Sequence, residues 1–210
     1  MPQDDGGTAP SAPDRGRWSR VPGRLRPGYP SFWGPLRTLG GAAYLLAGRD
    51  PRTGLLAYAV VGPEALSRSG QPHGRGWRFL RGEGVRTVVN LRMAGDDLPL
   101  LRGLGFSNYL HLPIPDGLAP TVAQGEAFLR FVTDPANQPA HVHCLRGIQR
   151  TGIMVALYRY AVEGWALQNA LLEANRYFPG PSGYQVDWLQ YWAAHHSPGD
   201  WAPPPAAKQT

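Results

Sequence analysis

One short segment of the sequence combines a nucleophile with groups that bind anions. The segment runs His143-Cys144-Leu145-Arg146-Gly147-Ile148-Gln149-Arg150-Thr151-Gly152. Apolar residues before it predict a buried strand and those after it a buried helix, so the segment is a strand–loop–helix junction. The N–H groups of such a loop and the positive end of the next helix converge on one point, which stabilises a thiolate or a bound oxyanion. The planar guanidinium of Arg150 can hold two oxygens of that anion.

The cysteine in this loop is the one cysteine of the chain. It therefore cannot form an internal disulfide or a cysteine zinc cluster, and it is either an inert core thiol or a nucleophile. The loop around Cys144 indicates the nucleophile. His195 and His196 have no other metal-binding residue types near them in the sequence, so we expect no metal site there. The expected chemistry needs no metal and no cofactor.

The loop resembles the signature of the cysteine-based tyrosine phosphatases, which is His-Cys, five residues, Arg, and then Ser or Thr. The matching positions are His143, Cys144, Gly147, Arg150 and Thr151. Residues 67–72 followed by 84–92 are similar to the opening of compact atypical dual-specificity phosphatases. The group that includes the inositol-pyrophosphate phosphatases of plants and fungi is similar too. The resemblance covers roughly Leu55 to Ala194 and leaves both ends of the chain outside it.

This resemblance implies a phosphomonoesterase that forms a cysteinyl-phosphate on Cys144. Such a reaction needs a carboxylic acid that protonates the leaving oxygen. The resemblance places that acid at Asp116, in a Pro-Asp-Gly loop after a predicted strand. Asp134, at the far end of the following helix, is the rival. The resemblance also implies that Thr151 donates to the departing thiolate and that His143 positions the loop. The residues expected to bind the phosphate are Leu145, Arg146, Gly147, Ile148, Gln149 and Arg150.

Predicted strands and helices alternate along the chain. Apolar runs at 85–91, 109–114 and 140–143 indicate strands, and the predicted helices lie at 77–83, 98–104, 152–162, 165–177 and 186–194. A further helix begins at Thr121, which forms a capping box with Gln124. The runs at 39–48 and 55–61 fit either a hairpin or a helix followed by a strand. The alternation predicts an α/β fold with a central, mostly parallel sheet and helices on both faces.

The composition of the 210 residues limits the function further. Pro, Gly and Arg gather at 1–37, which predicts a flexible tail before a domain at 38–197 and a second tail at 198–210. The net charge of +6 is spread along the chain, which argues against a nucleic-acid partner. No apolar run is long enough to span a membrane, and the first residues do not resemble a signal peptide. We therefore expect a cytoplasmic protein.

The substrate is the least specified part of the prediction. Arg146 supplies one basic residue inside the loop, and Ile148 and Gln149 supply none, so extra phosphates have few partners. The sequence favours an aryl phosphate or protein phosphotyrosine, with inositol phosphates as the alternative; the partner is a phosphorylated protein or small molecule. A module that binds phospho-ligands without turnover, a rhodanese-type sulfur transferase and an arsenate reductase stay open. Arg68 and Arg92 are interpreted as ion-pair partners that hold the fold, with a role as substrate ligands as the alternative.

Overall fold

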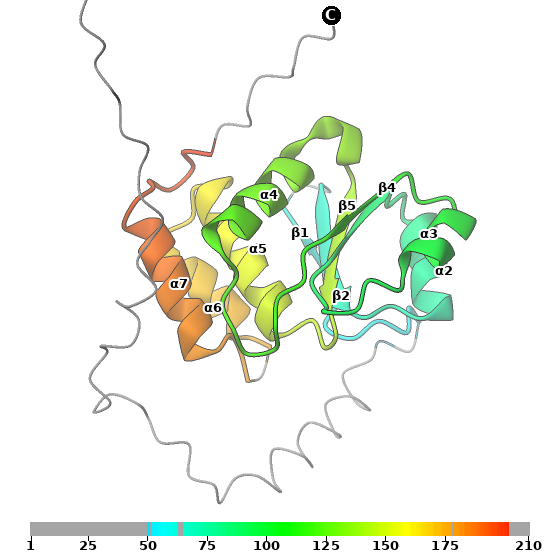
Figure 1. Ribbon diagram of the computed structural model, residues 1–210, viewed down its shortest axis with the longest axis horizontal. Helices are drawn as coiled ribbons and strands as arrows, with labels where there is room; N and C mark the ends of the chain where they lie inside the picture. The colour runs from blue at the N-terminus through cyan, green and yellow to red at the C-terminus, as the bar shows by residue number, and fades with distance from the viewer. Residues whose placement is uncertain (1–49, 51, 63–64, 178, 202–210) are drawn as a thin grey trace, which may run out of the picture. The chain divides into compact units, whose positions relative to one another are not determined.

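The computed structural model describes residues 50, 52–62, 65–177 and 179–201. The tail predicted at 1–37 and the apolar run at 39–48 lie outside these residues. A five-stranded sheet stands at the centre, with helices on both of its faces (Figure 1). The elements in chain order are β1 Ala59–Val61, β2 Leu66–Gly70, α2 Gly74–Gly82, β3 Thr87–Asn90, α3 Leu98–Gly103, β4 Asn108–His111, α4 Val122–Thr133, a 3-10 turn Pro135–Asn137, β5 Ala140–Cys144, α5 Gln149–Ala161, α6 Leu167–Ala174 and α7 Gly183–Ala193.

The topology of the sheet brings the predicted chemistry to one edge. The strand order is β1-β2-β5-β3-β4, and only the β1–β2 pair is antiparallel among these strands. Central β5 pairs its last residue, Cys144, with Gly70 at the end of β2, and pairs His143 with Asn90 at the end of β3. Parallel strands end at the same edge, so the loops after β2, β3 and β5 meet there. The predicted α/β fold is confirmed.

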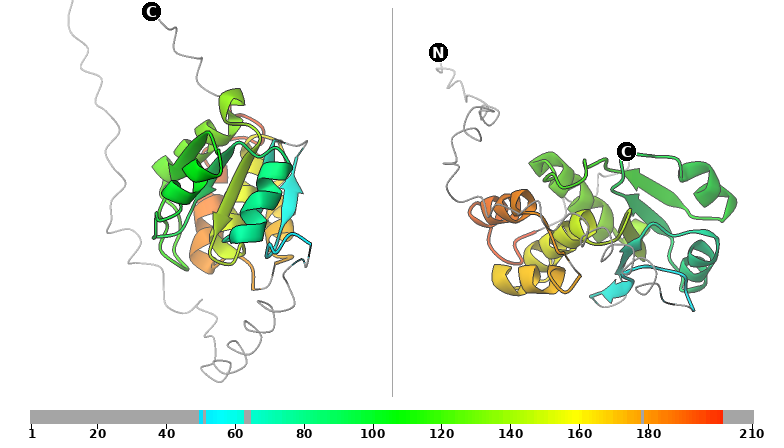
Figure 2. Two further views of the ribbon diagram at one scale, coloured as in Figure 1. Left: turned by 90° about the vertical axis from the view of Figure 1, so that its right-hand side faces the viewer. Right: turned by 90° about the horizontal axis from the view of Figure 1, so that it is seen from below.

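Each face of the sheet is covered by its own apolar core. Helices α4, α5, α6 and α7 pack on one face around the larger core, and α2 and α3 pack on the other around a smaller one (Figure 2). Almost every residue of α5 is buried, which explains its nearly continuous apolar sequence. None of the described helices is long and apolar enough to cross a membrane.

Three features differ from the sequence-based expectations. Strand β2 was not predicted, because its sequence Leu-Ser-Arg-Ser-Gly is polar although every residue is buried. Helix α5 begins at Gln149 rather than at Gly152, because its first turn is polar and faces the loop instead of the core. The chain also stays packed past the expected boundary at 197: Gly199 donates to the carbonyl of Tyr160 at 2.9 Å, and Trp201 to that of Ala161 at 3.1 Å.

Gly125 lies inside α4 and Gly152 inside α5, and substituting them tests how tightly these helices pack against their neighbours. A Cβ at Gly152 meets Ala174 and Pro181 at 3.7 Å, which is ordinary contact. We expect Gly152→Ala to raise the free energy of unfolding by about 0.5–1 kcal/mol through helix propensity. A Cβ at Gly125 comes within 3.0 Å of the buried Trp188 ring. Gly125→Ala should therefore lower stability by about 1–3 kcal/mol.

Urea unfolding of both variants measures the difference. If Gly125→Ala proved as stabilising as Gly152→Ala, the described contact between α4 and α7 would be wrong.

Candidate active site

The cysteine lies at the bottom of a loop that joins β5 to α5. Cys144 is buried, and its Sγ accepts a hydrogen bond from the N–H of Gly147 at 3.2 Å. Ile148 is the N-cap of α5, and its side chain makes no hydrogen bond to the first N–H groups of that helix. These N–H groups and the helix dipole favour negative charge at the loop. The arrangement is suited to hold an oxyanion beside the cysteine.

The loop is held against the end of β2 by backbone contact. The φ angle of Gly147 is +72°, and a Cβ there would lie 2.4 Å from the nitrogen of Gly70. The N–H of Gln71 donates to the carbonyl of Leu145 at 3.0 Å. The buried guanidinium of Arg68 donates to the carbonyl of Gly147 and lies 4.0 Å from the centre of the Tyr177 ring. Arg68 thus holds the loop in place, as the sequence analysis expected of a residue that holds the fold.

Arg150 reaches from the first turn of α5 to the loop that carries Asp116. One terminal nitrogen of its buried guanidinium donates to the carbonyl of Ile114 at 3.1 Å, and the other lies 3.0 Å from Oδ1 of Asp116. Its Nε and the hydroxyl of Thr151 are buried and have no hydrogen-bond partner in the described part of the chain. A buried donor without a hydrogen-bond partner lowers the stability of the folded protein. The Nε of Arg150 and the hydroxyl of Thr151 are such donors, and they are available to bind a ligand at the cysteine loop.

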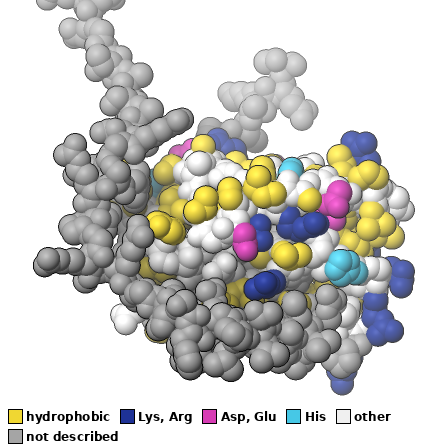
Figure 3. Space-filling model, turned by 60° about the horizontal axis from the view of Figure 1, so that its bottom comes forward, with side chains coloured by type: hydrophobic (Ala, Val, Ile, Leu, Met, Phe, Trp, Pro, Cys, Tyr) yellow, Lys and Arg dark blue, Asp and Glu magenta, His cyan; other side chains and the backbone are white. Residues whose placement is uncertain are grey.

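The two aspartates proposed as acids lie in different surroundings. The side chain of Asp116 is 73% exposed and points to the guanidinium at the loop. Asp134 follows the last turn of α4, where its carboxylate accepts from the N–H of Ala136 at 2.9 Å and caps the 3-10 turn. These contacts show that Asp134 serves to end one helix and to begin the next turn. On the side of the molecule that points down in Figure 1, basic side chains lie beside acidic ones (Figure 3).

His143 lies behind the cysteine and faces a buried carboxylate. Its Nε2 is 3.6 Å from Oδ2 of Asp97, and its ring meets Trp77 edge-on with centroids 5.6 Å apart. Burial lowers the pKa of His143 to about 3 and raises that of Asp97. His141, whose two ring nitrogens contact the hydroxyls of Ser67 and Ser69 at 2.9 Å, has its pKa lowered well below 6.5 by burial. Both histidines are therefore neutral at pH 7.

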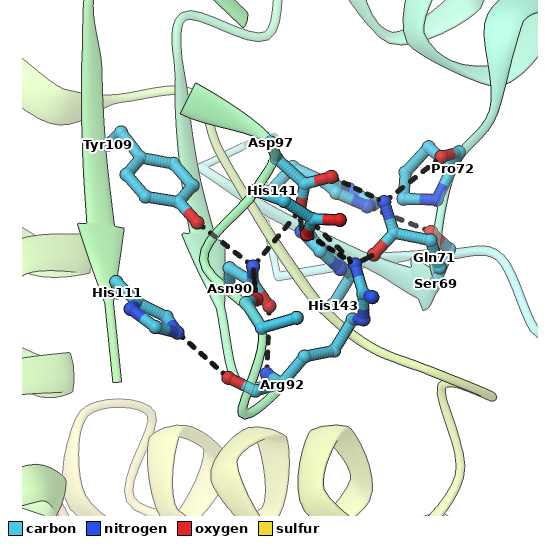
Figure 4. Close-up of polar contacts among 12 residues, drawn as sticks. Ser69, Gln71, Pro72, Asn90, Arg92, Asp97, Tyr109, His111, His141 and His143 are labelled. Atoms are coloured by element: carbon cyan, nitrogen blue, oxygen red, sulfur yellow. Dashed lines mark hydrogen bonds and ion pairs between the residues drawn. The ribbon is translucent and has the colours of Figure 1, made fainter. Parts of the chain in front are cut away.

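Asp97 is the centre of a polar network that extends from the ends of β2 and β3 (Figure 4). Its two oxygens accept from the side-chain amides of Gln71 at 2.9 Å and Asn90 at 3.0 Å. Asn90 also donates to the hydroxyl of Tyr109 at 2.9 Å. Arg92 donates to the amide oxygen of Gln71 at 2.8 Å and lies 3.7 Å from Asp97. Arg92 therefore holds the loop after β3 in place.

Comparison with known proteins identifies this arrangement. Residues 61–187 match the family described as "DSP-PTPase phosphatase fused to NAD+ Kinase". The chain belongs to this family. The match covers the whole cysteine loop and the Asp116 loop, so the chain is a dual-specificity phosphatase-like domain of the cysteine-based type. The resemblance stated from the sequence is confirmed.

The chain is similar in sequence to plant NAD kinases and to a bacterial dual-specificity phosphatase. "Probable NAD kinase 2, chloroplastic" of Oryza sativa subsp. japonica is 35% identical over 121 residues, which are 53% of this chain and 12% of the relative. The chain thus spans about an eighth of that plant protein. "Dual specificity protein phosphatase TpbA" of Pseudomonas aeruginosa (strain UCBPP-PA14) is 29% identical over 146 residues, which are 66% of each protein.

Solved structures share the fold of this DSP-PTPase domain. The active form of Tk-PTP has a TM-score of 0.57 and 26% identity, and the alignment covers 67% of this chain and 98% of that one. The catalytic core of the PP-IP phosphatase SIW14 from S. cerevisiae has a TM-score of 0.55 and 22% identity, with 66% and 91% covered. At that identity, SIW14 supports the fold alone.

Sequence reasoning located one part of this site and missed another. Cys144, Arg150, Thr151 and Asp116 lie at one edge of the sheet, within the region where they were predicted. Sequence reasoning missed the residues behind His143, namely Gln71, Asn90, Asp97 and Tyr109. Among the described residues, no three His, Cys, Asp or Glu side chains gather closely enough to hold a metal ion. The one signal for the missed network was the polar Asn90 at the end of an otherwise apolar strand.

The close approach of Gly147 to β2 predicts the effect of adding a methyl group to the loop. In Gly147→Ala the left-handed backbone costs about 1–2 kcal/mol, and the new Cβ overlaps the backbone of Gly70. A loop displaced by even about 1 Å should lower kcat/KM for an aryl phosphate roughly 100-fold. Gly84→Ala is the matched control, because Gly84 has a φ of +81° with nothing within 4 Å. It should lose stability and keep activity; equal activity in both variants would contradict the described loop.

The two neutral histidines predict how stability depends on pH. Their folded-state pKa values lie below the unfolded value of about 6.5, so the unfolded chain gains protons first as the pH falls. His143 should therefore lower the free energy of unfolding by about 2 kcal/mol between pH 7 and pH 5, and His141 should act in the same direction. Urea unfolding at several pH values measures this dependence, which His143→Gln should weaken.

The raised pKa of Asp97 acts in the opposite direction at lower pH, so the comparison between variants isolates the histidine. An unchanged pH dependence in His143→Gln would show that His143 has the same pKa in the folded and the unfolded chain, which would contradict the lowered pKa.

Proposed function

We propose that this DSP-PTPase domain is a phosphomonoesterase in which Cys144 is the nucleophile. One observation supports this most: Arg150 lies at the cysteine loop and within 3.0 Å of Asp116. A nucleophile, an anion-binding group and a proton donor thus lie at one edge of the sheet. These are the three groups that cleavage of a phosphate monoester needs.

In the first step the thiolate of Cys144 attacks phosphorus in line with the leaving oxygen. The P–S bond forms while the P–O bond to the leaving group breaks, and Asp116 gives its proton to that oxygen. The N–H groups of residues 145–150 and the guanidinium of Arg150 stabilise the charge on the other three oxygens. The free Nε of Arg150 supports this role, because it is a donor without a partner in the described chain.

In the second step a water molecule attacks the cysteinyl-phosphate. Asp116, now a carboxylate, takes a proton from the water, and the P–S bond breaks to release phosphate and the thiolate. The unpaired hydroxyl of Thr151 donates to the departing sulfur. His143 acts as a positioning residue: it is neutral, fully buried and fixed between Trp77 and Asp97.

The side chains of the loop support a substrate with a single phosphate. Leu145 is 53% exposed and Arg146 is exposed, whereas Ile148 is buried. The loop therefore offers one apolar side chain and one cation to the group that carries the phosphate. This favours a phosphotyrosine or another aryl phosphate, with phosphorylated protein as the physiological class and inositol phosphates as the alternative.

A second substrate is suggested by the relatives. The matching family is described as fused to NAD+ kinase, and two plant relatives are named NAD kinase 2. The product of such a kinase carries a phosphate monoester on the 2′ oxygen of a ribose. We therefore include NADP+ in a panel with phosphotyrosine, phosphothreonine, a phosphoinositide and an inositol pyrophosphate. The substrate with the highest kcat/KM identifies the class.

The nucleophile is tested with p-nitrophenyl phosphate in the presence of EDTA. The protein should release nitrophenolate, and Cys144→Ser should lower turnover by roughly 10³-fold or more, since serine lacks a stabilised anion there. Rapid acid quenching of the wild type should trap phosphate on the protein. Turnover at the wild-type rate in Cys144→Ser would refute the mechanism. Phosphate binding without turnover in the wild type would favour a binding module.

A further inference from the structure

We infer that Ser182 and Gln185, which begin helix α7, are positioning residues for the acid Asp116. This inference rests on the proposed function, because it assumes that Asp116 protonates the leaving group. The two side chains bind the backbone of the residues that follow Asp116, although they lie far along the chain from it. The hydrogen bonds that these two side chains make among the described residues go to that backbone and to each other's N–H groups.

The acid is carried by a tight turn. The N–H of Leu118 donates to the carbonyl of Pro115 at 3.1 Å, and Gly117, with a φ of +75°, supplies the left-handed position of that turn. Asp116 occupies the preceding position of the turn, so the direction of its carboxylate follows the orientation of the turn. The side chain is 73% exposed, and one ion pair, with Arg150, is recorded for it.

Helix α7 holds this turn through two strong contacts. The hydroxyl of Ser182 donates to the carbonyl of Gly117 at 2.7 Å, and the side-chain amide of Gln185 donates to the carbonyl of Leu118 at 3.0 Å. Gln185 is fully buried, so its amide would be costly to leave without an acceptor. The turn is thus tied to a helix that packs in the larger core.

The same two side chains also form the capping box of α7. The oxygen of Ser182 accepts from the N–H of Gln185 at 3.4 Å, and the amide oxygen of Gln185 accepts from the N–H of Ser182 at 3.0 Å. Capping uses only the acceptor oxygens, and Asp or Glu would supply those equally well. The hydroxyl and amide donors are not needed for the cap. Both of them bind the turn that carries the acid.

The capping box of α4 holds the other end of the same segment. The amide of Gln124 donates to the carbonyl of Pro113 at 2.9 Å, while its oxygen accepts from the N–H of Thr121 at 2.9 Å. The hydroxyl of Thr121 accepts from the N–H of Gln124 and donates no hydrogen bond among the described residues. The segment from Pro113 to Leu118 is therefore fixed at both ends by glutamines of two capping boxes.

The contacts to the turn matter most for the position of Asp116 when substrate is bound. The phosphate takes the guanidinium fork of Arg150, so Asp116 loses the ion pair that holds it in the free protein. The turn is then kept in place by its backbone contacts. Of these, the bond from Ser182 is made to the residue next to the acid, and the bond from Gln185 to the residue after that. Without them the carboxyl would be less well placed to reach the leaving oxygen.

The test compares substrates that differ in their need for an acid. Phenyl phosphate has a poor leaving group and needs protonation, whereas p-nitrophenyl phosphate has a good one. Ser182→Gly removes the hydroxyl donor while keeping a good N-cap residue, and Gln185→Met removes the amide at similar size. Each should lower kcat for phenyl phosphate about 10-fold or more and that for p-nitrophenyl phosphate less than about 3-fold. Asp116→Asn should give the same pattern with a larger loss.

Thr121→Gly is the matched control. It removes the equivalent cap hydroxyl on α4 without removing a bond to the acid turn, so both substrates should react at wild-type rates. Equal losses on the two substrates in Ser182→Gly and Gln185→Met, or no loss on either, would overturn the inference while Asp116→Asn keeps its pattern. If Asp116→Asn itself showed no leaving-group dependence, the acid assignment would fail with it. The assignment of Cys144 as the nucleophile is tested separately, by the activity of Cys144→Ser.

Discussion

The structure depends on the contact between the cysteine loop and the end of β2. The left-handed Gly147 lets the loop backbone lie directly on Ser69 and Gly70, at a distance that leaves no room for a side-chain carbon. Arg68 and the N–H of Gln71 then bind two carbonyls of the loop. In the loop held in this way, the N–H of Gly147 donates to the sulfur of Cys144. The remaining parts of the site are arranged around this loop.

This contact explains why β2, a strand rich in polar residues, lies beside β5, the strand that ends in Cys144. Strand β2 is fully buried although it contains two serines and an arginine. The serines contact His141 on β5, and the arginine supports the loop. Polar side chains in a buried strand are stable only when each has a partner. Here the partners are parts of the site, so the strand links the stability of the sheet to the shape of the loop.

Local sequence patterns were sufficient for the fold class and for the cysteine loop. The apolar run of α5, the β-branched run of β3 and the Thr121–Gln124 capping box each carry their information within a few residues, and all three are present in the structure. Strand β2 and the network around Asp97 could not be found in this way. Their residues are polar, and their burial follows from partners distant in sequence. The contact between Ser182 and Gly117 is of the same kind, since only the packing of α7 brings the two together.

The position of α7 has a consequence for how the domain becomes active during synthesis. A ribosome releases the cysteine loop and the Asp116 turn well before residues 182–193, and the hydrogen bonds to Gly117 and Leu118 cannot form until that last helix has docked. The same helix supplies Trp188, Leu189 and Trp192 to the larger core, so the core is completed and the acid turn is fixed in one late step of folding.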